Sequence, residues 1–437
     1  MTLRQLAIFF FLTAGLISCG KDVIEEEQDN PSSEDIVSFT SDVIARIEIT
    51  TDDGVAVDSK EKYRPCTVKV SGKEEYAMEV RGKIRGRGNS TWKWYPKKPY
   101  RIKLEESSSF LGMAPDKDWV LLADYRDVTH MMNLTGFYLA KELGLPHTNH
   151  VRYASVSLNG KDMGLYMVTE QVEEGDHRVK LDPEKGILLT LDINDGPGDV
   201  PDATDNFWSE VFSMAAAVKY PKDADEKVRD NVKEEFSFLE RAIDSEDWTA
   251  VQRELDVKSM ARYILVQEII CNVEMDNNPS MRSGFIHRYD DDSLWAMGPL
   301  WDCDGGFSYN WGDMYDSRGL GHTYFENYRT LIFGSDPYNH YGAYGSTPSD
   351  FFCDLFGIPE FVKLLQKEWS DNHDRLLAGL LACLAETESL IGEAAQADMD
   401  RWGIKNYRHA EEYDKLRNWL TRRFKYLDGV IRNYPSH

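Results

Sequence analysis

The segment from Asn272 to Phe307 constrains the fold of this chain most, because its pattern is typical of a helix end followed by a hairpin. Residues 284–289 and 294–297 are strand-like, and Asp-Asp-Asp-Ser between them favours a turn. A hairpin returns the chain to the end of the sheet at which it began. Residues before and after this hairpin are therefore expected to meet.

Polar residues flank the hairpin on both sides. Asp276 and Asn278 precede it, and Asp302 and Asp304 follow it within Trp-Asp-Cys-Asp-Gly-Gly-Phe. Hard divalent cations such as Mg²⁺ bind carboxylate and amide oxygens together with substrate phosphates. Phosphoryl transfer needs one acidic residue to orient the attacking hydroxyl and others to hold the metal. The alternative is that Asp276 and Asp302 only cap a helix and a turn, and these residues alone favour neither interpretation.

A basic segment with several glycines lies far upstream. From Arg81 to Lys103 the chain has nine Lys or Arg residues and no Asp or Glu. A glycine-rich turn between strands exposes backbone N–H groups, and flanking cations are natural phosphate partners. Solvated lysines on an edge strand are the alternative. The candidate phosphate-binding residues are Arg87, Asn89, Ser90, Lys98, Arg101 and Lys103.

Glu170 is a further candidate site residue. It ends a hairpin of residues 153–158 and 164–168, whose Asn159-Gly160 turn is the preferred type I′ pair. A carboxylate there can hold a lysine that contacts phosphates, as a glutamate does in protein kinases. A plain surface glutamate is the alternative.

The hydrophobic pattern predicts an α+β chain. Its front half alternates with the period of strands, whereas its rear half is helical, with a loose boundary between residues 170 and 225. Residues 310–350 show little periodicity and are expected to form a long functional loop. The expected strands are 44–49, 66–70, 76–84 and 100–104, and the expected helices are 127–143, 228–243, 256–271 and one around 376–384.

Charge and cysteine content exclude several classes of function. The formal net charge of −25 argues against nucleic acid as a partner, because a phosphate backbone would be repelled. Five of the six cysteines are scattered, with no C-x-x-C pair and no zinc-like spacing.

The N-terminus predicts export and lipid anchoring. Arg4 precedes a short apolar run of residues 6–17, which is too short to span a bilayer. The run ends in Leu-Ile-Ser-Cys, which resembles a lipobox with Cys19 as the lipidated residue. We therefore expect a signal peptide at 1–18, a flexible tether at 19–40, and a cell-envelope lipoprotein of the outer membrane, with display on the cell surface as one option. A cleaved secretory signal with an incidental cysteine is the alternative.

Several motifs, in order, resemble the CotH (spore coat protein H) kinase-like family, in particular lipoprotein members from Bacteroides-type bacteria. The motifs span about residues 44–310. They are Arg87-Gly88-Asn89-Ser90-Thr91-Trp92, Lys97-Lys98-Pro99-Tyr100-Arg101-Ile102, Leu121-Leu122-Ala123-Asp124 through Asn133, Leu143-Gly144, Leu158-Asn159-Gly160 with Gly164 to Gln171, and Trp301 to Phe307.

The resemblance implies an atypical protein-kinase-like fold over residues 41–437, with a nucleotide side at 41–175 and a helical portion at 220–437. It implies ATP and Mg²⁺ as cofactors, with Mn²⁺ as an alternative metal, and Ser/Thr of a protein as the acceptor. Asp276 matches the catalytic aspartate and Asp302 the metal-binding one, with Asp304 and Asn278 as further ligands. Arg87, Ser90 and Lys98 would neutralise the phosphates, and Glu170 would position a lysine.

Two functions follow from the sequence. The first is a kinase of the CotH type. The second is a non-catalytic surface module on the same fold, which binds glycan or protein through its aromatic residues and the 310–350 loop.

Overall fold

The computed structural model describes residues 38–275, 281–309, 324–333, 350–405 and 407–434. The chain divides into two units, Met1–Ile36 and Val37–His437, and all described residues belong to the second. The predicted signal peptide and Cys19 lie outside the described residues. Among the described helices, none is long and apolar enough to cross a membrane.

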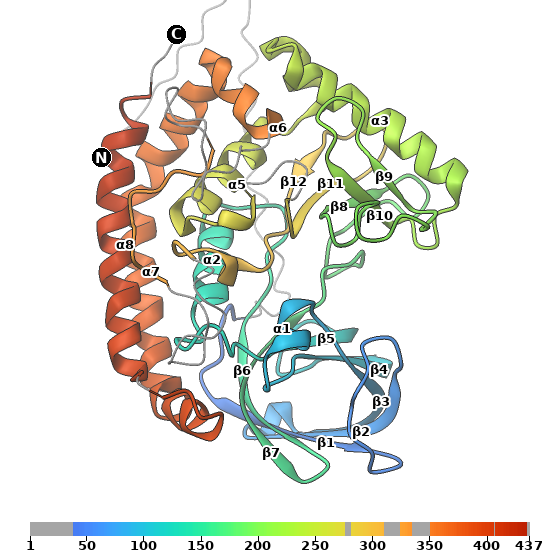
Figure 1. Cartoon of the computed structure of the whole chain (residues 1–437), viewed down its shortest axis with the longest axis vertical. Helices are drawn as coiled ribbons and strands as arrows, with labels where there is room; N and C mark the ends of the chain where they lie inside the picture. The colour runs from blue at the N-terminus through green and yellow to red at the C-terminus, as the bar shows by residue number, and fades with distance from the viewer. Residues whose placement is uncertain (1–37, 276–280, 310–323, 334–349, 406, 435–437) are drawn as a thin grey trace, which may run out of the picture. The chain divides into compact units, whose positions relative to one another are not determined.

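Seven strands of the front half close into a barrel (Figure 1). Neighbouring strands pair antiparallel in the order β1-β2-β3-β4-β5-β7-β6, and β6 closes the ring by pairing parallel with β1. Alternate side chains of β1 and β2, among them Ile47 and Val68, fill the buried interior. The strands are β1 (Ile44–Thr51), β2 (Arg64–Ser71), β3 (Met78–Gly86), β4 (Tyr100–Ser108), β5 (Asp116–Leu122), β6 (Arg152–Leu158) and β7 (Lys161–Glu170).

The glycine-rich segment leaves the barrel between β3 and β4 and forms the short helix α1 (Ser90–Trp94). Gly88 has a φ of +78°, and a Cβ there would lie 2.4 Å from Oγ1 of Thr91. Only glycine fits this turn without strain. The turn brings α1 to the end of the barrel, where its residues face a cleft described below.

A second sheet has the strand order β12-β11-β8-β10-β9, with every pair antiparallel. Its strands are β8 (Ile187–Leu191), β9 (Asn206–Trp208), β10 (Ala215–Tyr220), β11 (Gly284–Arg288) and β12 (Ala296–Met297). The predicted hairpin is confirmed, since Ile286 pairs with Met297. In the same sheet Leu191 pairs with Gly284, so the end of β8 lies beside the start of β11.

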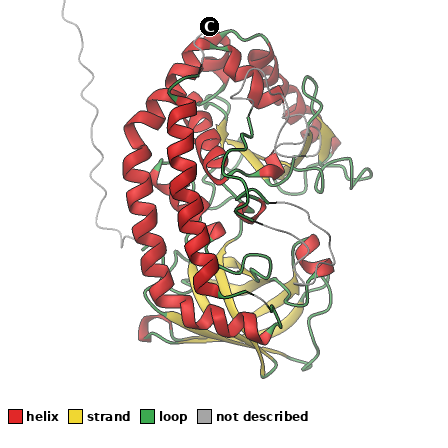
Figure 2. Ribbon diagram, turned by 60° about the vertical axis from the view of Figure 1, so that its left-hand side comes forward, coloured by secondary structure: helices red, strands yellow, loops and turns green. Residues whose placement is uncertain are grey.

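Helices make up most of the rest. They are α2 (Met132–Glu142), α3 (Glu226–Asp244), α4 (Trp248–Glu254), α5 (Val257–Ile270), α6 (Asp350–Cys353), α7 (Pro359–Arg401) and α8 (His409–Ile431). Four 3-10 turns are η1 (Glu74–Tyr76), η2 (Val273–Met275), η3 (Cys303–Gly305) and η4 (Asp354–Gly357). The two longest helices, α7 and α8, run side by side (Figure 2). The mixture of a β-rich front and a mainly helical rear agrees with the predicted α+β class.

Two predictions of secondary structure need correction. The helix expected from residue 127 begins at Met132, because the preceding segment turns through positive φ at Asp124 and His130. Asp127 nevertheless accepts the N–H of Met132 over 2.8 Å, which is a capping contact. The prediction also missed β8, β9 and β10 of the second sheet, which lie between residues 187 and 220 in the predicted boundary region. Strand β8 escaped prediction because all five of its residues are buried, so it shows no alternation.

Candidate functional site

A cleft of about 1190 Å³ lies between the end of the barrel and the second sheet. Its barrel wall carries the glycine-rich segment and α1, together with residues 122–126. Its opposite wall carries the ends of β8 and β11 and the Trp-Asp-Cys-Asp segment. The polar residues of that opposite wall include Asp192, Asn194, Glu274, Arg282, Ser283, Asp302 and Asp304.

The cleft brings together predicted site residues that are far apart in the sequence, from 201 residues for Arg101 and Asp302 to 217 residues for Arg87 and Asp304. Arg87, Asn89, Ser90, Arg101, Asp302 and Asp304 all line it. Lys98, Lys103 and Glu170 are not among its lining residues. Asp276 and Asn278 lie outside the described residues. Residues next to them are fixed, because the N–H of Arg282 donates to the carbonyl of Glu274 over 3.0 Å.

Asp302 is held from the second sheet. The hydroxyl of Ser283 donates to Oδ2 of Asp302 over 2.9 Å, and the N–H of Ser283 donates to Oδ2 of Asp192 over 3.0 Å. Asp192 also accepts two bonds from Asn194. Both Ser283 and Asp302 adopt positive φ, at 56° and 52°. Strain of this kind at non-glycine residues is typical of functional sites.

Burial and like charge raise the pKa values of this acidic wall. Desolvation raises the pKa of Asp302, and the neighbouring Asp304 adds to the effect, whereas Arg87 opposes it. Burial likewise raises the pKa of Glu274 to about 7 and that of Asp192 to about 6. A cation placed between carboxylates that repel one another would lower their pKa values and stabilise their charged forms.

Asp304 has a different partner from the one predicted. The guanidinium of Arg126 donates to Oδ2 of Asp304 from Nε at 3.2 Å and from Nη2 at 2.8 Å. Both side chains are largely buried, at 5% and 13% exposure. The hydroxyl of Tyr324 donates to the carbonyl of Asp304 over 2.8 Å. An ion pair with Arg126 therefore already engages one oxygen of this predicted metal ligand.

The barrel wall presents cations to the acidic wall. The guanidinium of Arg87 lies 5.3 Å from the ring of Trp301, the residue before Asp302. Burial lowers the pKa of Arg87, and the charges of Asp302 and Asp304 counteract this. Arg101 also lines the cleft, although its Nε donates to Asp118 over 2.7 Å. Basic side chains of the barrel wall thus line the same cavity as the carboxylates of the opposite wall.

Lys98 and Lys103 occupy other positions. Lys98 donates to the carbonyl of Trp92 over 2.5 Å, and burial lowers its pKa. Lys103 donates to Oδ2 of Asp118 over 2.8 Å, so the carboxylate of Asp118 joins it to Arg101. Local sequence could not identify Asp118 as their partner, because Asp118 lies on the neighbouring strand β5, where it pairs with Lys103.

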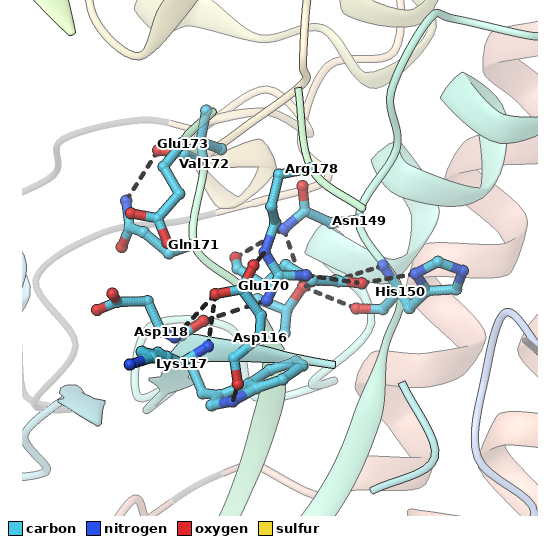
Figure 3. A network of polar contacts seen from close by, with 12 residues as sticks. Asp116, Lys117, Asp118, Asn149, His150, Glu170, Gln171, Val172, Glu173 and Arg178 are labelled. Atoms are coloured by element: carbon cyan, nitrogen blue, oxygen red, sulfur yellow. Dashed lines mark hydrogen bonds and ion pairs between the residues drawn. The ribbon is translucent and has the colours of Figure 1, made fainter. Parts of the chain in front are cut away.

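No lysine of the described residues contacts the carboxylate of Glu170, so the expectation that Glu170 holds a lysine is wrong. Its carboxylate contacts Nδ1 of His150 at 2.6 Å and lies 3.7 Å from Nη1 of Arg178 (Figure 3). Arg178 is fully buried and lies 4.7 Å from the ring of Trp119. Gln171 and Val172 follow Glu170 and line the cleft. Glu170 therefore holds in place the segment that lines the cleft, although Glu170 itself does not line it.

The neighbouring Lys97 is engaged in a buried network that reaches the C-terminal helices. Its Nζ lies 2.7 Å from Oδ2 of Asp398 on α7 and also donates to the carbonyl of Leu165. His130 lies between Asp398, at 3.5 Å, and Asp124, at 3.4 Å. Since Asp124 lines the cleft, this network joins α7 to the cleft wall.

Asp192, Glu274, Ser283 and Arg126 are among the polar residues of the cleft that sequence reasoning missed. Asp192 had one available signal, because it directly follows the apolar run of β8. Glu274 is two residues from Asp276, and Ser283 directly precedes β11. Arg126 had no signal, since its contact with Asp304 spans 178 residues.

No group of three or more His, Cys, Asp or Glu side chains is arranged to hold a metal ion in the part of the chain that the structure describes. A metal held in the cleft would therefore need further ligands in addition to the described side chains, such as phosphate oxygens.

Comparison with protein families decides the classification. The family described as CotH kinase protein matches residues 84–427, which run from β3 to α8. The chain belongs to the CotH kinase family. No curated protein sequence matches the chain. The part matched to the CotH kinase family contains most of both walls of the cleft, whereas Lys60 and Glu61 of the barrel wall, and the strands β1 and β2, precede it.

Proposed function

We propose that the cleft binds ATP with Mg²⁺, or Mn²⁺ in its place, and transfers the terminal phosphoryl group to a Ser or Thr hydroxyl of a protein. The observation that carries this proposal is the pairing of two walls. Arg87 and Ser90 beside a glycine turn face Asp302 across the same cavity. Membership of the CotH kinase family supports the same class of reaction.

The residues of the acidic wall fit a nucleotide-bound divalent cation. Asp302 offers a half-buried carboxylate with a raised pKa, and Ser283 donates a hydrogen bond to one of its oxygens. Mg²⁺ typically takes only one or two carboxylates and completes its shell with phosphate oxygens and water. A bound metal would neutralise charge on the phosphates during transfer. Asp302 would be its main ligand, and Asn278 and Asp304 remain predicted ligands.

The chain's own residues would bind and orient the reactants. Arg87, Ser90 and exposed N–H groups near Gly88 would neutralise phosphate oxygens. Asp276 is the proposed residue that accepts the proton of the attacking hydroxyl. Positioning of this kind supplies most of the catalysis in phosphoryl transfer, because little covalent chemistry is left to the protein.

Transfer of labelled phosphate from ATP to protein, with nucleotide affinity measured in parallel, tests the proposal. The wild type is expected to bind ATP only with a divalent metal and to transfer label. Asp302→Asn and Asp276→Asn are expected to abolish transfer while the thermal unfolding temperature changes little. Asp292→Asn, in the exposed turn of the hairpin, is the matched control and should behave as the wild type.

A chain that neither binds nor uses any nucleotide with any divalent metal would contradict this proposal. Affinity for a glycan or protein that survives Asp302→Asn would then support the non-catalytic alternative.

We propose in addition that Cys19 carries a lipid that anchors the protein to the outer membrane. Membrane-fraction recovery of the full-length chain should be lost in Cys19→Ala. Recovery of that variant with the membrane would contradict lipid anchoring.

A further inference from the structure

Three cations on the barrel wall of the cleft have no carboxylate partner among the described residues. They are Lys60, Arg85 and Lys93, which we call the rim cations. Nζ of Lys60 donates to the side-chain oxygen of Asn89 over 3.0 Å, and Arg85 donates to the carbonyl of Lys60. Nζ of Lys93 lies 5.7 Å from the ring of Trp94. Neutral groups therefore orient these charges, and the exposed carboxylate of Glu61 is an acidic neighbour of Lys60 and Arg85 at the cleft without forming an ion pair with either.

Two cations of the same barrel that lie outside the cleft are paired with carboxylates. Arg81 contacts Asp52 at 2.6 Å, and Lys103 contacts Asp118 at 2.8 Å. The chain has 75 acidic and 50 basic residues, so carboxylates are abundant. Unpaired cations gathered at one cleft of such an acidic protein indicate that their anion comes from outside.

Arg85 adds a second observation. Its Nε is buried and has no hydrogen-bond acceptor among the described residues, while its guanidinium lies 5.0 Å from the ring of Tyr63. A buried N–H without an acceptor costs free energy, which an incoming oxygen would recover. The aromatic ring holds the guanidinium in place for such an acceptor.

We propose that the rim cations bind acidic side chains of the protein acceptor, so that the phosphorylated Ser or Thr is flanked by Asp or Glu. This inference rests on the proposed function. Arg87, over Trp301 and next to Asp302, is the cation placed for the nucleotide phosphates. The rim cations are separate from it, and Lys93 and Trp94 are exposed on α1. Carboxylates of an extended acceptor can reach exposed cations such as these.

Steady-state kinetics with two peptides of equal length test the proposal. Both carry one Ser, flanked in one by Glu and in the other by Lys. The wild type is expected to favour the Glu peptide. In Lys60→Glu/Lys93→Glu the KM for the Glu peptide should rise about tenfold, since two charge pairs are lost and two repulsions gained. The KM for ATP should not change.

Lys83→Glu is the matched control. Lys83 is exposed on the same strand as Arg85 and lies 4.8 Å from the same Tyr63 ring, but it does not line the cleft. Its reversal changes the charge of the barrel in the same direction, by half as much as in the double variant, and should leave the preference for the Glu peptide intact. Equal effects of Lys83→Glu and the double variant would overturn the inference, because general charge would explain both.

The remaining outcomes separate this inference from the proposed function. A wild type that phosphorylates both peptides equally overturns the inference alone. A double variant with a raised KM for ATP and an unchanged KM for peptide assigns the rim cations to the nucleotide and also overturns it. Fluorescence anisotropy of a labelled Glu peptide without nucleotide covers the last case. If the wild type binds this peptide, the double variant does not, and neither protein transfers phosphate to any peptide, the rim cations bind an acidic ligand. The proposed phosphoryl transfer would then be wrong.

Discussion

The hydroxyl of Ser283 donates a 2.9 Å hydrogen bond to Oδ2 of Asp302, and its backbone N–H reaches Asp192 over 3.0 Å. Leu191 pairs with Gly284, so Asp192 and Ser283 are the next residues at the same end of β8 and β11. The second sheet therefore sets the position of Asp302 through Ser283. This makes Ser283 and Asp192 positioning residues for the proposed metal ligand.

Replacing Ser283 by glycine should lower metal affinity about tenfold or more without unfolding the protein, as is typical when a partner of a metal ligand is lost. Glycine tolerates the φ of +56°, so the variant removes the hydroxyl without adding strain. Isothermal titration with Mn²⁺ and ATP measures the effect. Ser293→Gly, in the exposed turn where Ser293 bonds Asp290, is the control. Unchanged Mn²⁺ affinity in Ser283→Gly would show that the bond does not position Asp302.

Asp304→Asn should lower stability more than it lowers metal affinity. The change removes the charge that pairs with the buried guanidinium of Arg126, and breaking a buried pair typically costs about 3–5 kcal/mol. Asp302→Asn should instead abolish Mn²⁺-dependent nucleotide binding. Urea unfolding and titration of the same two variants compare these effects. Equal loss of metal binding in both variants would contradict this prediction and would show that Asp304 is a metal ligand.

The sequence predicted the parts of the site that are local. The hairpin of residues 284–297 and the glycine turn before α1 depend on residues close in the chain, and turn chemistry identified both. The sequence could not show which cations of the basic segment line the cleft and which pair with carboxylates elsewhere. Lys103 pairs with Asp118, and Lys97 with Asp398 on a helix 301 residues away. Such partners depend on strand register and helix packing, which local patterns do not fix.

Glu170 illustrates the same limit from the acidic side. A glutamate at the end of a strand resembles a kinase glutamate in position, but its partners His150 and Arg178 come from two separate loops. The second sheet was also missed in part, because an apolar run such as β8 is shared by buried strands and buried helices.

Lys97→Met should destabilise the folded chain by about 3 kcal/mol, since the buried Asp398 would lose its nearest cation and keep only His130, at 3.5 Å. The loss should appear as a lower urea midpoint with an unchanged slope. Lys98→Met is the adjacent control and should cost much less, because among the described residues Lys98 donates to the carbonyl of Trp92 and has no ion pair. Similar losses in the two variants would show that the Asp398 pair does not stabilise the link to α7.

The buried His130 should make stability fall at alkaline pH. Despite burial, which acts in the opposite direction, contacts with Asp124 and Asp398 raise the pKa of His130 from 6.5 to about 9. The cation Lys97 also faces this histidine and opposes the shift. Because the folded-state pKa exceeds the unfolded one, the stabilisation is complete below pH 6.5 and is lost as pH rises through about 9.

Urea unfolding of the wild type and His130→Asn between pH 6 and 10 measures this loss. Asparagine tolerates the φ of +56° at this position but does not titrate. The stability advantage of the wild type over the variant should shrink by on the order of 3 kcal/mol across this range. A constant difference between the two proteins at all pH values would mean that His130 is neutral in the folded state, and that Lys97 alone balances the charges of Asp124 and Asp398.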